Sequence, residues 1–591
     1  MITLQNFLFP DPAICTEHAL YFRTNGDVGV SQTRGEVWLA RGALVTFDTY
    51  FNLFNVSKWH RGCDLSGLWA EIRGEGRIEL RIFLAVPGQS WEVLYCETET
   101  LRPDAPLVAD ISHYAERTER GLIYVEVKAL EKDGAIITGG RFATGAVPET
   151  LPRLAVSITT FKREKQVRTT VARLEAFLQD FPFADQIHVQ VVDNGQSAEI
   201  AASDKVTPIL NPNYGGAGGF ARGLLEAEKG GFSHCLFMDD DASFDMENIA
   251  RAYMFLALSN DPKNAVSGAM INNTHKWAMW ENGAFFEGSC HPLYCGTDLR
   301  DRDQVFAMEM ESGSRIQKKN FYGGWWFFAF AIDQVQHHPF PFFVRGDDIS
   351  FSLMNDFRIY TLNGVVSFQD DFSEKESAQT LYLDLRNHII HHLVTPELER
   401  SALGTAKVAI RFIMRSMLRL HYESAAAQLM AWKDVMSGPE FFDRNIDMAE
   451  RRAAIKALMK REVWEDVDPS DLPQRRRVIN RPRHKLERLG KYTLNGHLVP
   501  FSARRWDKIV LEMGERGIVF FSFGAAQITY LNTTKTKAYT VRQSKREFFA
   551  LAWEMAKVAR VFIRDFETIK AAYKGGYEEL TQRGYWERKL A

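Results

Sequence analysis

The sequence has few cysteines, no long apolar run and almost no net charge, and each absence excludes a class of protein. The 6 cysteines among 591 residues form no Cys-x-x-Cys pair, so we expect no disulfide framework and predict a reducing, cytoplasmic compartment. The longest aromatic and apolar run, from Phe321 to Ile332, is shorter than the roughly 20 residues of a membrane-spanning helix. A formal net charge of −3 argues against a dedicated nucleic-acid-binding protein.

The composition is that of a globular protein with several domains. Hydrophobic residues make up 46% and charged residues 25%, which excludes a disordered or fibrous chain. At roughly 100–200 residues each, the length predicts three or four domains. Apolar and polar residues alternate in runs such as 77–84 and 121–127, which predicts an antiparallel β-sandwich over residues 1–150. The sandwich is either a carbohydrate-binding or assembly module or a purely structural one.

Beyond residue 150 the periodicity changes twice. Buried-strand patterns at 154–158, 187–192 and 235–238 alternate with helical patterns at 165–178 and 219–229, which predicts a mostly parallel α/β sheet over residues 151–400. Residues 401–591 have a mainly helical pattern; the predicted helices are 402–436, 448–464 and 545–573. Ligands of a parallel sheet bind beyond the carboxyl ends of its strands, so we expect the functional site there.

Polar residues follow each of the three predicted strands. These are Thr-Thr-Phe-Lys-Arg at 159–163, Asp-Asn-Gly at 193–195 and Asp-Asp-Asp at 239–241. Each run alone is typical of a turn or a solvated cap, but together at one edge of a sheet they predict a site. Carboxylates there can accept hydrogen bonds from a uracil or a ribose. Two carboxylates one residue apart can bind Mg²⁺ or Mn²⁺, which bridges a diphosphate and stabilises the departing negative charge.

A glycine-rich run at 211–223 leads into the helix predicted at 219–229. Its backbone can approach a ligand closely, and the start of a helix favours anions. The run lacks the Lys-Ser or Lys-Thr of a P-loop and the glycine spacing of a dinucleotide-binding fingerprint. The loop therefore predicts a phosphate or sugar contact of another kind.

These motifs together resemble the family 2 glycosyltransferases with a GT-A fold. The runs 321–328, 346–348 and 382–387 narrow the resemblance to the polymerising galactofuranosyltransferases that build cell-wall galactan, with motifs that match over about residues 154–390. The resemblance implies a GT-A, Rossmann-like catalytic domain that uses UDP-galactofuranose and a divalent cation, Mn²⁺ or Mg²⁺. It also implies a glycan or glycolipid acceptor, a role in cell-wall or polysaccharide biosynthesis and a homo-oligomer.

The resemblance also implies roles for individual residues. Asp348 is the general base that takes the proton of the acceptor hydroxyl, and Asp347 orients the base or the acceptor. The remaining roles are uridine contacts from Arg163 and Asp193, donor-sugar and ribose contacts from Asn213, Asp240 and the glycines Gly215, Gly216, Gly218 and Gly219, metal and diphosphate contacts from Asp239 and Asp241, and an acceptor floor of Trp325 and Trp326. Core packing is the alternative for the two tryptophans.

The sequence departs from the family pattern in two places. Gly346 stands where such enzymes usually carry a tryptophan, and the segment 365–371 lacks their metal-binding histidine. Gln369 or Asp370 then replaces that ligand, since an amide or carboxylate oxygen suits Mg²⁺ or Mn²⁺; otherwise the third protein ligand is missing. Two other functions stay open, namely a hexosyltransferase that uses dTDP-rhamnose or another UDP-sugar and a non-catalytic glycan-binding protein.

Two groups of basic residues predict contact with an anionic membrane. Lys407, Arg411, Arg415 and Arg419 recur at every fourth residue, and the segment 475–491 holds eight Lys and Arg against one acid. Attraction to anionic lipid is worth roughly 1 kcal/mol for each basic residue near the surface. A solvated face is the equally weighted alternative, and the balanced charge of the chain disfavours nucleic acid as the partner.

Overall fold

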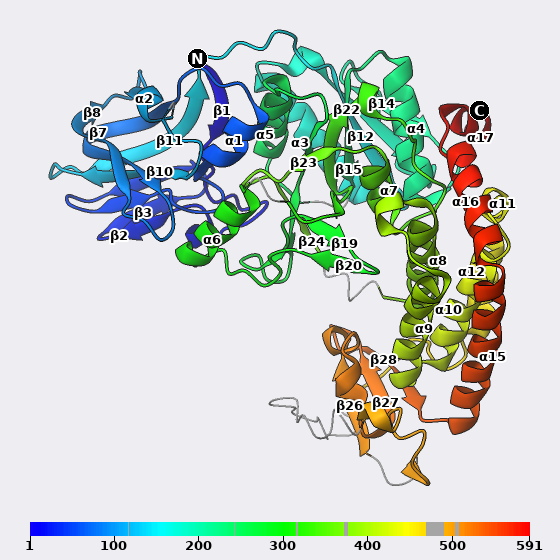
Figure 1. Ribbon diagram of the computed structural model, residues 1–591. Helices are drawn as coiled ribbons and strands as arrows, with labels where there is room; N and C mark the ends of the chain where they lie inside the picture. Colours follow the sequence, from blue (N-terminus) through cyan, green and yellow to red (C-terminus); the bar gives the residue numbers. More distant parts are fainter. Residues whose placement is uncertain (116, 241–242, 315–316, 371–375, 469–489, 503–506) are drawn as a thin grey trace.

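The computed structural model describes residues 1–591 except 116, 241–242, 315–316, 371–375, 469–489 and 503–506. Figure 1 shows a β-rich N-terminal part, a central part of strands and helices, and long C-terminal helices beside a small sheet. All six cysteines are free, as the sequence predicts. Within the described ranges, every helix is too short or too polar to cross a bilayer.

The N-terminal strands pair in antiparallel fashion, as their alternation predicts. The long strand β7 pairs with β9 and β11 along its first half and with β8 and β10 along its second. Gly76 lies between the halves with φ +106°, and a Cβ there would lie 2.7 Å from the carbonyl oxygen of Gly134, so the change of partner requires glycine. That two faces of such strands form a sandwich stays a prediction. The strands are β1 (Ile2–Asn6), β2 (Arg23–Asn25), β3 (Val28–Ser31), β4 (Glu36–Leu39), β5 (Leu44–Thr46), β6 (Phe54–Asn55), β7 (Trp69–Ala85), β8 (Glu92–Leu101), β9 (Leu107–Asp110), β10 (Leu122–Ala129) and β11 (Ala135–Thr144), with the helices α1 (Val56–Gly62) and α2 (Ser112–Ala115).

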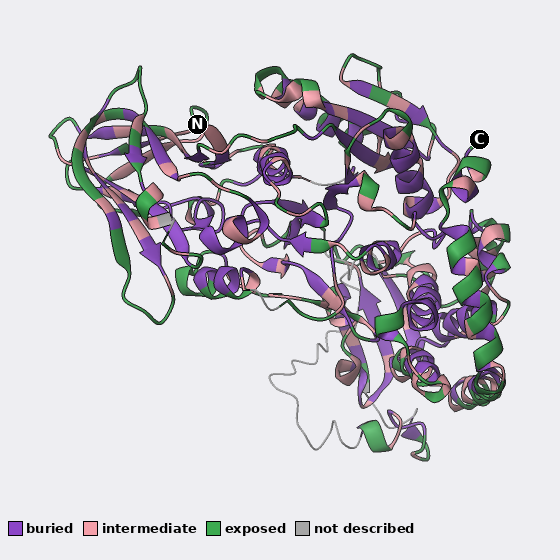
Figure 2. Cartoon of the chain, turned by 45° about the horizontal axis from the view of Figure 1, so that its top comes forward, coloured by how far each residue is buried: buried purple, intermediate pink, exposed green. Residues whose placement is uncertain are grey.

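The central sheet confirms the predicted alternation of strands and helices. Its strand order is β14-β13-β12-β15-β22-β16-β23, and β12, β13, β14 and β15 run parallel. β22 is antiparallel to both of its neighbours, so the sheet is mixed. Figure 2 shows that the strands are buried and that exposed residues lie on the outer helices and loops. The strands are β12 (Leu154–Thr160), β13 (Ile187–Asp193), β14 (Val206–Leu210), β15 (His234–Asp239), β16 (Asn264–Ser267), β22 (Phe327–Ala331) and β23 (Arg358–Tyr360), and the helices are α3 (Glu164–Asp180), α4 (Gly215–Lys229), α5 (Glu247–Ala257) and α7 (Asp347–Met354).

Two small three-stranded sheets accompany the central one. β24 is parallel to β17, which also pairs with β18, while β19 pairs with β20 and β21. The strands are β17 (Ala269–Asn272), β18 (Met279–Glu281), β19 (Ala284–Phe286), β20 (Cys290–Pro292), β21 (Phe321–Tyr322) and β24 (Val366–Gln369), and the helices are α6 (Arg302–Ser312) and α8 (Ala378–Val394).

The C-terminal part is helical, as predicted, but it also contains a sheet that the sequence reasoning missed. The predicted helix 402–436 is two helices, because Leu420 adopts φ +66°, a conformation that a right-handed helix does not accommodate. The predicted helix 545–573 is likewise divided, at Asp565. The helices are α9 (Ala402–Leu418), α10 (Tyr422–Val435), α11 (Glu440–Arg444), α12 (Ala449–Leu458), α15 (Lys545–Arg564), α16 (Phe566–Leu580) and α17 (Arg583–Lys589), and the strands are β25 (Glu465–Asp466), β26 (Asp507–Glu512), β27 (Ala525–Leu531) and β28 (Lys537–Arg542).

The C-terminal helices return to the central sheet and support the start of α7. Tyr577 of α16 and Ser350 of α7 share a hydrogen bond between their hydroxyl groups, 2.6 Å apart. Trp586 of α17 donates from its indole nitrogen to the carbonyl oxygen of Pro339 at 2.7 Å. Because these side chains are buried, the last helices hold α7 against the sheet.

Candidate active site

Parallel strands bring the predicted donor-site residues to one edge of the central sheet. In the register of β12 with β13, Thr160 is level with Asp193, and in the register with β15, Thr159 is level with Asp239. These strands run in the same direction (Figure 1), so the residues lie at the same carboxyl edge, where parallel sheets bind ligands.

The Asp240 carboxylate lies between two residues that the end of β12 supplies. Thr160 donates its hydroxyl proton to Asp240 Oδ2, and Arg163 Nε lies 3.4 Å from Asp240 Oδ1. The Asp240 side chain is nearly inaccessible, whereas more than a third of the Arg163 side chain is exposed. The pairing therefore fixes Arg163 at the edge and leaves part of its surface open to a ligand.

Asp193 organises the loop that follows β13. Its carboxylate accepts backbone N–H bonds from Gly195, Ser197 and Ala198 at 2.9, 2.7 and 2.7 Å. The neighbouring Asn194 donates from Nδ2 to the carbonyl oxygen of Gly215 at 2.9 Å, which ties this loop to the glycine-rich run. A uridine contact from Asp193 stays a prediction.

The glycine-rich run packs so closely that side chains would not fit. At Gly215, with φ +71°, a Cβ would lie 2.0 Å from the carbonyl oxygen of Phe343, and at Gly219 it would lie 2.2 Å from Thr159 Cγ2. Asn213 Oδ1 accepts the N–H of Gly215 at 3.1 Å, which holds the start of α4. Gly219 therefore allows α4 to approach the end of β12, and Gly215 allows it to approach the backbone at Phe343.

The glycine-rich run also adjoins the acid pair at the start of α7. A Cβ on Gly216 would lie 3.5 Å from Asp347 Oδ2, so the two motifs meet although more than 120 residues separate them. The structure thus places the predicted base region next to the predicted donor loop.

The acid pair itself is largely removed from solvent. Asp347 is buried and Asp348 half-buried, and Asp348 Oδ1 accepts the N–H of Ile349 at 2.9 Å. Burial raises the pKa of both carboxyls above the ordinary range; the Asp348 charge raises the pKa of Asp347 further, and the Arg345 guanidinium opposes both shifts. Carboxyls with raised pKa values are suited to accept and release protons near neutral pH.

Glu281, at the end of β18, is a site residue that the sequence reasoning missed. It is buried, and its Oε1 has no hydrogen-bond partner among the residues described. Burial, followed by the charge of Asp348, raises the pKa of Glu281 to about 8. A single glutamate in the run Met-Trp-Glu-Asn-Gly carries no recognisable pattern, so only the fold places it near the pair.

Asp239 and Gln369 form the start of a candidate metal site. Gln369 Nε2 is 3.5 Å from Asp239 Oδ2, whereas the Asp370 carboxylate accepts from Asn273 at 3.3 Å. Asp241 lies outside the described residues, and within those residues no group of three or more His, Cys, Asp or Glu could hold a metal. An amide oxygen and a carboxylate are ligands that Mg²⁺ and Mn²⁺ prefer, so the residues present fit such an ion.

The tryptophans predicted as an acceptor floor are mostly inside the protein. Trp325 is 5% exposed and contacts the rings of Phe220, Phe237 and Phe351. Trp326 is 8% exposed and donates from Nε1 to a backbone carbonyl oxygen at 2.7 Å. These contacts favour the core packing that the sequence left open, and the acceptor role stays a prediction.

Comparison with known proteins identifies relatives along nearly the whole chain. No protein-family model matches it. It is 24% identical over 613 residues to the galactofuranosyltransferase GlfT2 of Mycobacterium tuberculosis, covering 96% of this chain and 93% of that protein. It is 21% identical to the galactofuranosyltransferase GlfT2 of Mycolicibacterium smegmatis, covering 96% and 92%. A solved mannosyltransferase from Pyrobaculum calidifontis, in complex with GDP-mannose and Mn²⁺, has 18% identity and a TM-score of 0.27, covering 54% of this chain and 84% of that one.

Proposed function

We propose that this chain, a glycosyltransferase similar in sequence to galactofuranosyltransferases, transfers galactofuranose from UDP-galactofuranose to a hydroxyl group of a glycan. The observation that supports the proposal is the close approach of two motifs at Gly216 and Asp347, where a Cβ on Gly216 would lie 3.5 Å from Asp347 Oδ2. One motif belongs to a strand edge suited to a nucleotide sugar, and the other is a buried acid pair suited to proton transfer. The reaction inverts the configuration of the anomeric carbon.

The donor binds along the carboxyl edge of the central sheet. Its uridine contacts Arg163 and Asp193, and the N-terminus of α4, with its partial positive charge, lies toward the diphosphate. Close packing of the loop on the strand ends brings its backbone to the edge of the sheet where the donor would bind. The ribose and sugar contacts come from Asn213, Asp240, Gly215, Gly216, Gly218 and Gly219.

A divalent cation, Mn²⁺ or Mg²⁺, is part of the proposal. Asp239, Gln369 and Asp241 would hold it, the last on the grounds of its position in the sequence. When bound, such an ion supplies positive charge that stabilises the departing diphosphate.

Asp348 acts as the general base. It takes the proton of the acceptor hydroxyl, whose oxygen forms a bond to the anomeric carbon while the bond from that carbon to the diphosphate breaks. The bonding electron pair leaves with UDP. Burial raises the pKa of both carboxyls, and the charge of Asp348 raises the pKa of Asp347 further, so a charged Asp348 favours the protonated form of Asp347. Asp347 can then orient the acceptor or the base.

The wider architecture belongs to the same proposal. It comprises a β-sandwich over 1–150, a GT-A catalytic domain over 151–400 and a helical domain over 401–591, assembled as a homo-oligomer in the cytoplasm. The order of the parallel strands, with β12 between β13 and β15, supports a Rossmann-like catalytic domain.

Membrane contact at the inner face of the cell membrane is a further part, because a lipid-linked acceptor is anchored there. Lys407, Arg411 and Arg415 are exposed on α9, but Arg419 is not part of that surface. Its side chain is 1% exposed and lies 3.3 Å from Glu376, so the four-residue basic stripe predicted from the sequence is wrong at its last member. Of the basic segment 475–491, residues 475–489 lie outside the described residues. We expect pelleting with anionic liposomes at low salt and release at high salt; absence of pelleting at low salt contradicts membrane contact alone.

A UDP-release assay with a panel of nucleotide sugars tests the function directly. Purified protein is incubated with UDP-galactofuranose, other UDP-sugars or dTDP-rhamnose, a glycan acceptor, and Mn²⁺, Mg²⁺ or chelator. We expect acceptor-dependent release from UDP-galactofuranose with a divalent cation. Faster turnover of dTDP-rhamnose identifies a rhamnosyltransferase, and binding without turnover of any donor identifies a glycan-binding protein.

A further inference from the structure

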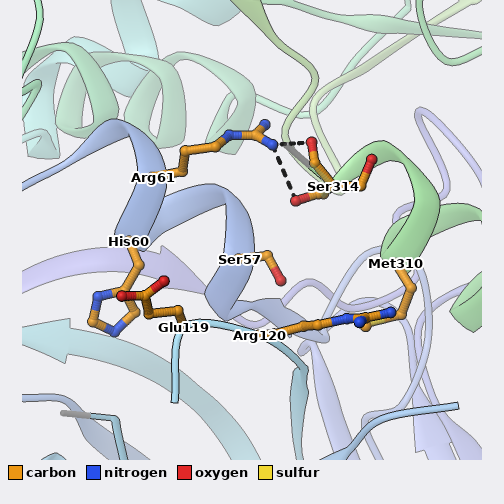
Figure 3. A pocket seen from close by; sticks show the side chains of 8 residues that line it. Ser57, His60, Arg61, Glu119, Arg120, Met310 and Ser314 are labelled. Atoms are coloured by element: carbon orange, nitrogen blue, oxygen red, sulfur yellow. Dashed lines mark hydrogen bonds between the residues drawn. The ribbon is translucent and has the colours of Figure 1, made fainter. Parts of the chain in front are cut away.

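A pocket outside the catalytic edge opens between the N-terminal strands and the end of α6 (Figure 3). It has a volume of about 420 Å³ and is lined from three segments: α1, the loop before β10, and the end of α6 with the two residues after it. No residue predicted to contact the donor or acceptor lines it. The pocket therefore needs an explanation of its own.

The walls of the pocket are fixed to each other. Lys58 of α1 and Glu309 of α6 form an ion pair of 2.7 Å with both side chains buried. Arg61 Nη1 donates to the carbonyl oxygens of Gly313, at 3.1 Å, and Ser314, and these contacts are visible in Figure 3. Breaking a buried pair leaves an uncompensated charge, so α1 and α6 keep their spacing. The cavity is thus largely pre-formed, as binding sites are.

Several polar groups at the pocket have hydrogen-bond donors or acceptors that the described residues leave unused. The exposed guanidinium of Arg120 has no ion pair or hydrogen bond within the described chain, and Figure 3 shows its side chain extended toward Met310. His60 Nε2 is buried and has no partner among the same residues. Ser57 Oγ accepts the N–H of Gly121 at 3.3 Å, so its own proton can be donated. Buried polar atoms normally have partners, which a ligand can supply here.

The charge and size of the pocket indicate the class of ligand. The lining holds two guanidinium groups, of Arg61 and Arg120, and one carboxylate, of Glu119. Guanidinium groups bind phosphate and carboxylate through paired hydrogen bonds. About 420 Å³ exceeds the need of an inorganic anion and falls within the range of small-molecule sites, while the Ser57 hydroxyl and the His60 imidazole in the lining suit hydroxyl groups. We propose that the pocket binds an anionic sugar, a glycan unit that carries a phosphate or a carboxylate.

Calorimetry on the full-length protein tests the site without relying on transfer activity. Saturating UDP and Mg²⁺ occupy the donor site, and glucose 6-phosphate, glucuronate and glucose are titrated separately. We expect one of the charged sugars to bind at least tenfold more tightly than glucose, and the two charged arms show whether phosphate or carboxylate is preferred. Arg120→Gln should weaken that binding at least tenfold. Arg120→Lys keeps the charge but loses the paired N–H donors of the guanidinium, so it should weaken binding less.

Arg117→Gln is the matched control, because Arg117 is an exposed arginine of the same loop that does not line the pocket. It should bind as the wild type does, and thermal unfolding of each variant should match the wild type. Absence of binding by both charged sugars at millimolar concentration overturns the proposal. So does equal affinity for glucose, or an Arg120→Gln variant that is folded and binds with wild-type affinity.

Discussion

The candidate site holds two acidic groups in opposite electrostatic surroundings. At the strand edge, Asp240 is paired with Thr160 and Arg163, and Asp239 has the Gln369 amide within reach. Near the start of α7, Asp347 and Glu281 are buried and their pKa values are raised chiefly by burial.

The difference suggests a division of labour between the two groups. Hydrogen-bond donors and cations favour the charged form of a carboxyl, whereas desolvation favours the neutral form. The strand-edge acids are therefore suited to bind cationic and polar ligands. The α7 acids, Asp347 and Asp348, and the neighbouring Glu281 are suited to exchange protons. Substitution of single residues in each group tests this difference in chemical role.

The largest expected effect comes from Asp348→Asn. The amide cannot take the acceptor proton, and general-base help contributes about 10²–10⁴-fold, so kcat should fall by that factor. UDP affinity should not change, because the donor loop and strand edge are intact. Transfer rates and UDP titrations measure the two quantities separately.

Asp347→Asn is the matched control for that variant, since it alters the same buried pair. If Asp348 is the general base, Asp347→Asn should lower kcat less than Asp348→Asn does. Should Asp348→Asn keep more than a tenth of the wild-type rate while Asp347→Asn does not, the base is Asp347.

Gln369→Ala tests the strand-edge group. If Gln369 holds the proposed cation together with Asp239, loss of its amide should raise the Mn²⁺ or Mg²⁺ concentration for half-maximal rate by about tenfold or more, because loss of supporting groups costs metal sites at least that much. Asn273→Ala, which removes a side chain that contacts Asp370 instead, should titrate as the wild type does. Equal metal titrations for Gln369→Ala and the wild type would remove Gln369 from the site.

Glu281→Gln tests the buried group through stability. The pKa of Glu281 rises from its ordinary value to about 8 in the folded state, so the folded protein binds more protons than the unfolded one between about pH 4.5 and 8. The free energy of unfolding then falls with rising pH in that window, by up to about 1.4 kcal/mol per pH unit. Glu281→Gln should lack this part of the slope and gain on the wild type toward pH 8. Parallel pH curves from urea unfolding would contradict the raised pKa.

The strand edge could be predicted from sequence because its pattern is local. Asp193 and Asp239 each follow a buried-strand run directly, and parallel strands place such positions at the same edge. The close approach of Gly216 to Asp347 was not predictable in this way. It depends on packing between segments more than 120 residues apart, which periodicity does not encode.

The misses have physical reasons of the same kind. The four-residue spacing that ends at Arg419 is the same for a solvated stripe and for a buried ion pair. Arg419 is buried because it pairs with Glu376, a residue outside its helix. Polar and apolar residues alternate over 527–530 in β27 and over 540–542 in β28, with a turn between Leu531 and Lys537. That alternation is the local signal in the sequence for the C-terminal sheet between the helices.

The smallest expected effect comes from Arg345→Gln, which sharpens the comparison by changing the surroundings of the α7 acids without removing them. The Arg345 guanidinium lowers the pKa of Asp347 and Asp348 against the effect of burial, so its loss should raise both. Since Asp348 must be charged to act as a base, the acidic limb of the kcat–pH profile should move to higher pH, by less than about one unit for a partly exposed charge, while the rate at high pH is unchanged. Arg345→Lys should keep the limb in place, and Arg358→Gln, at an exposed arginine paired with Asp261, should leave the profile as it is. A limb that stays at its wild-type position in Arg345→Gln would mean that another group sets the protonation of the base.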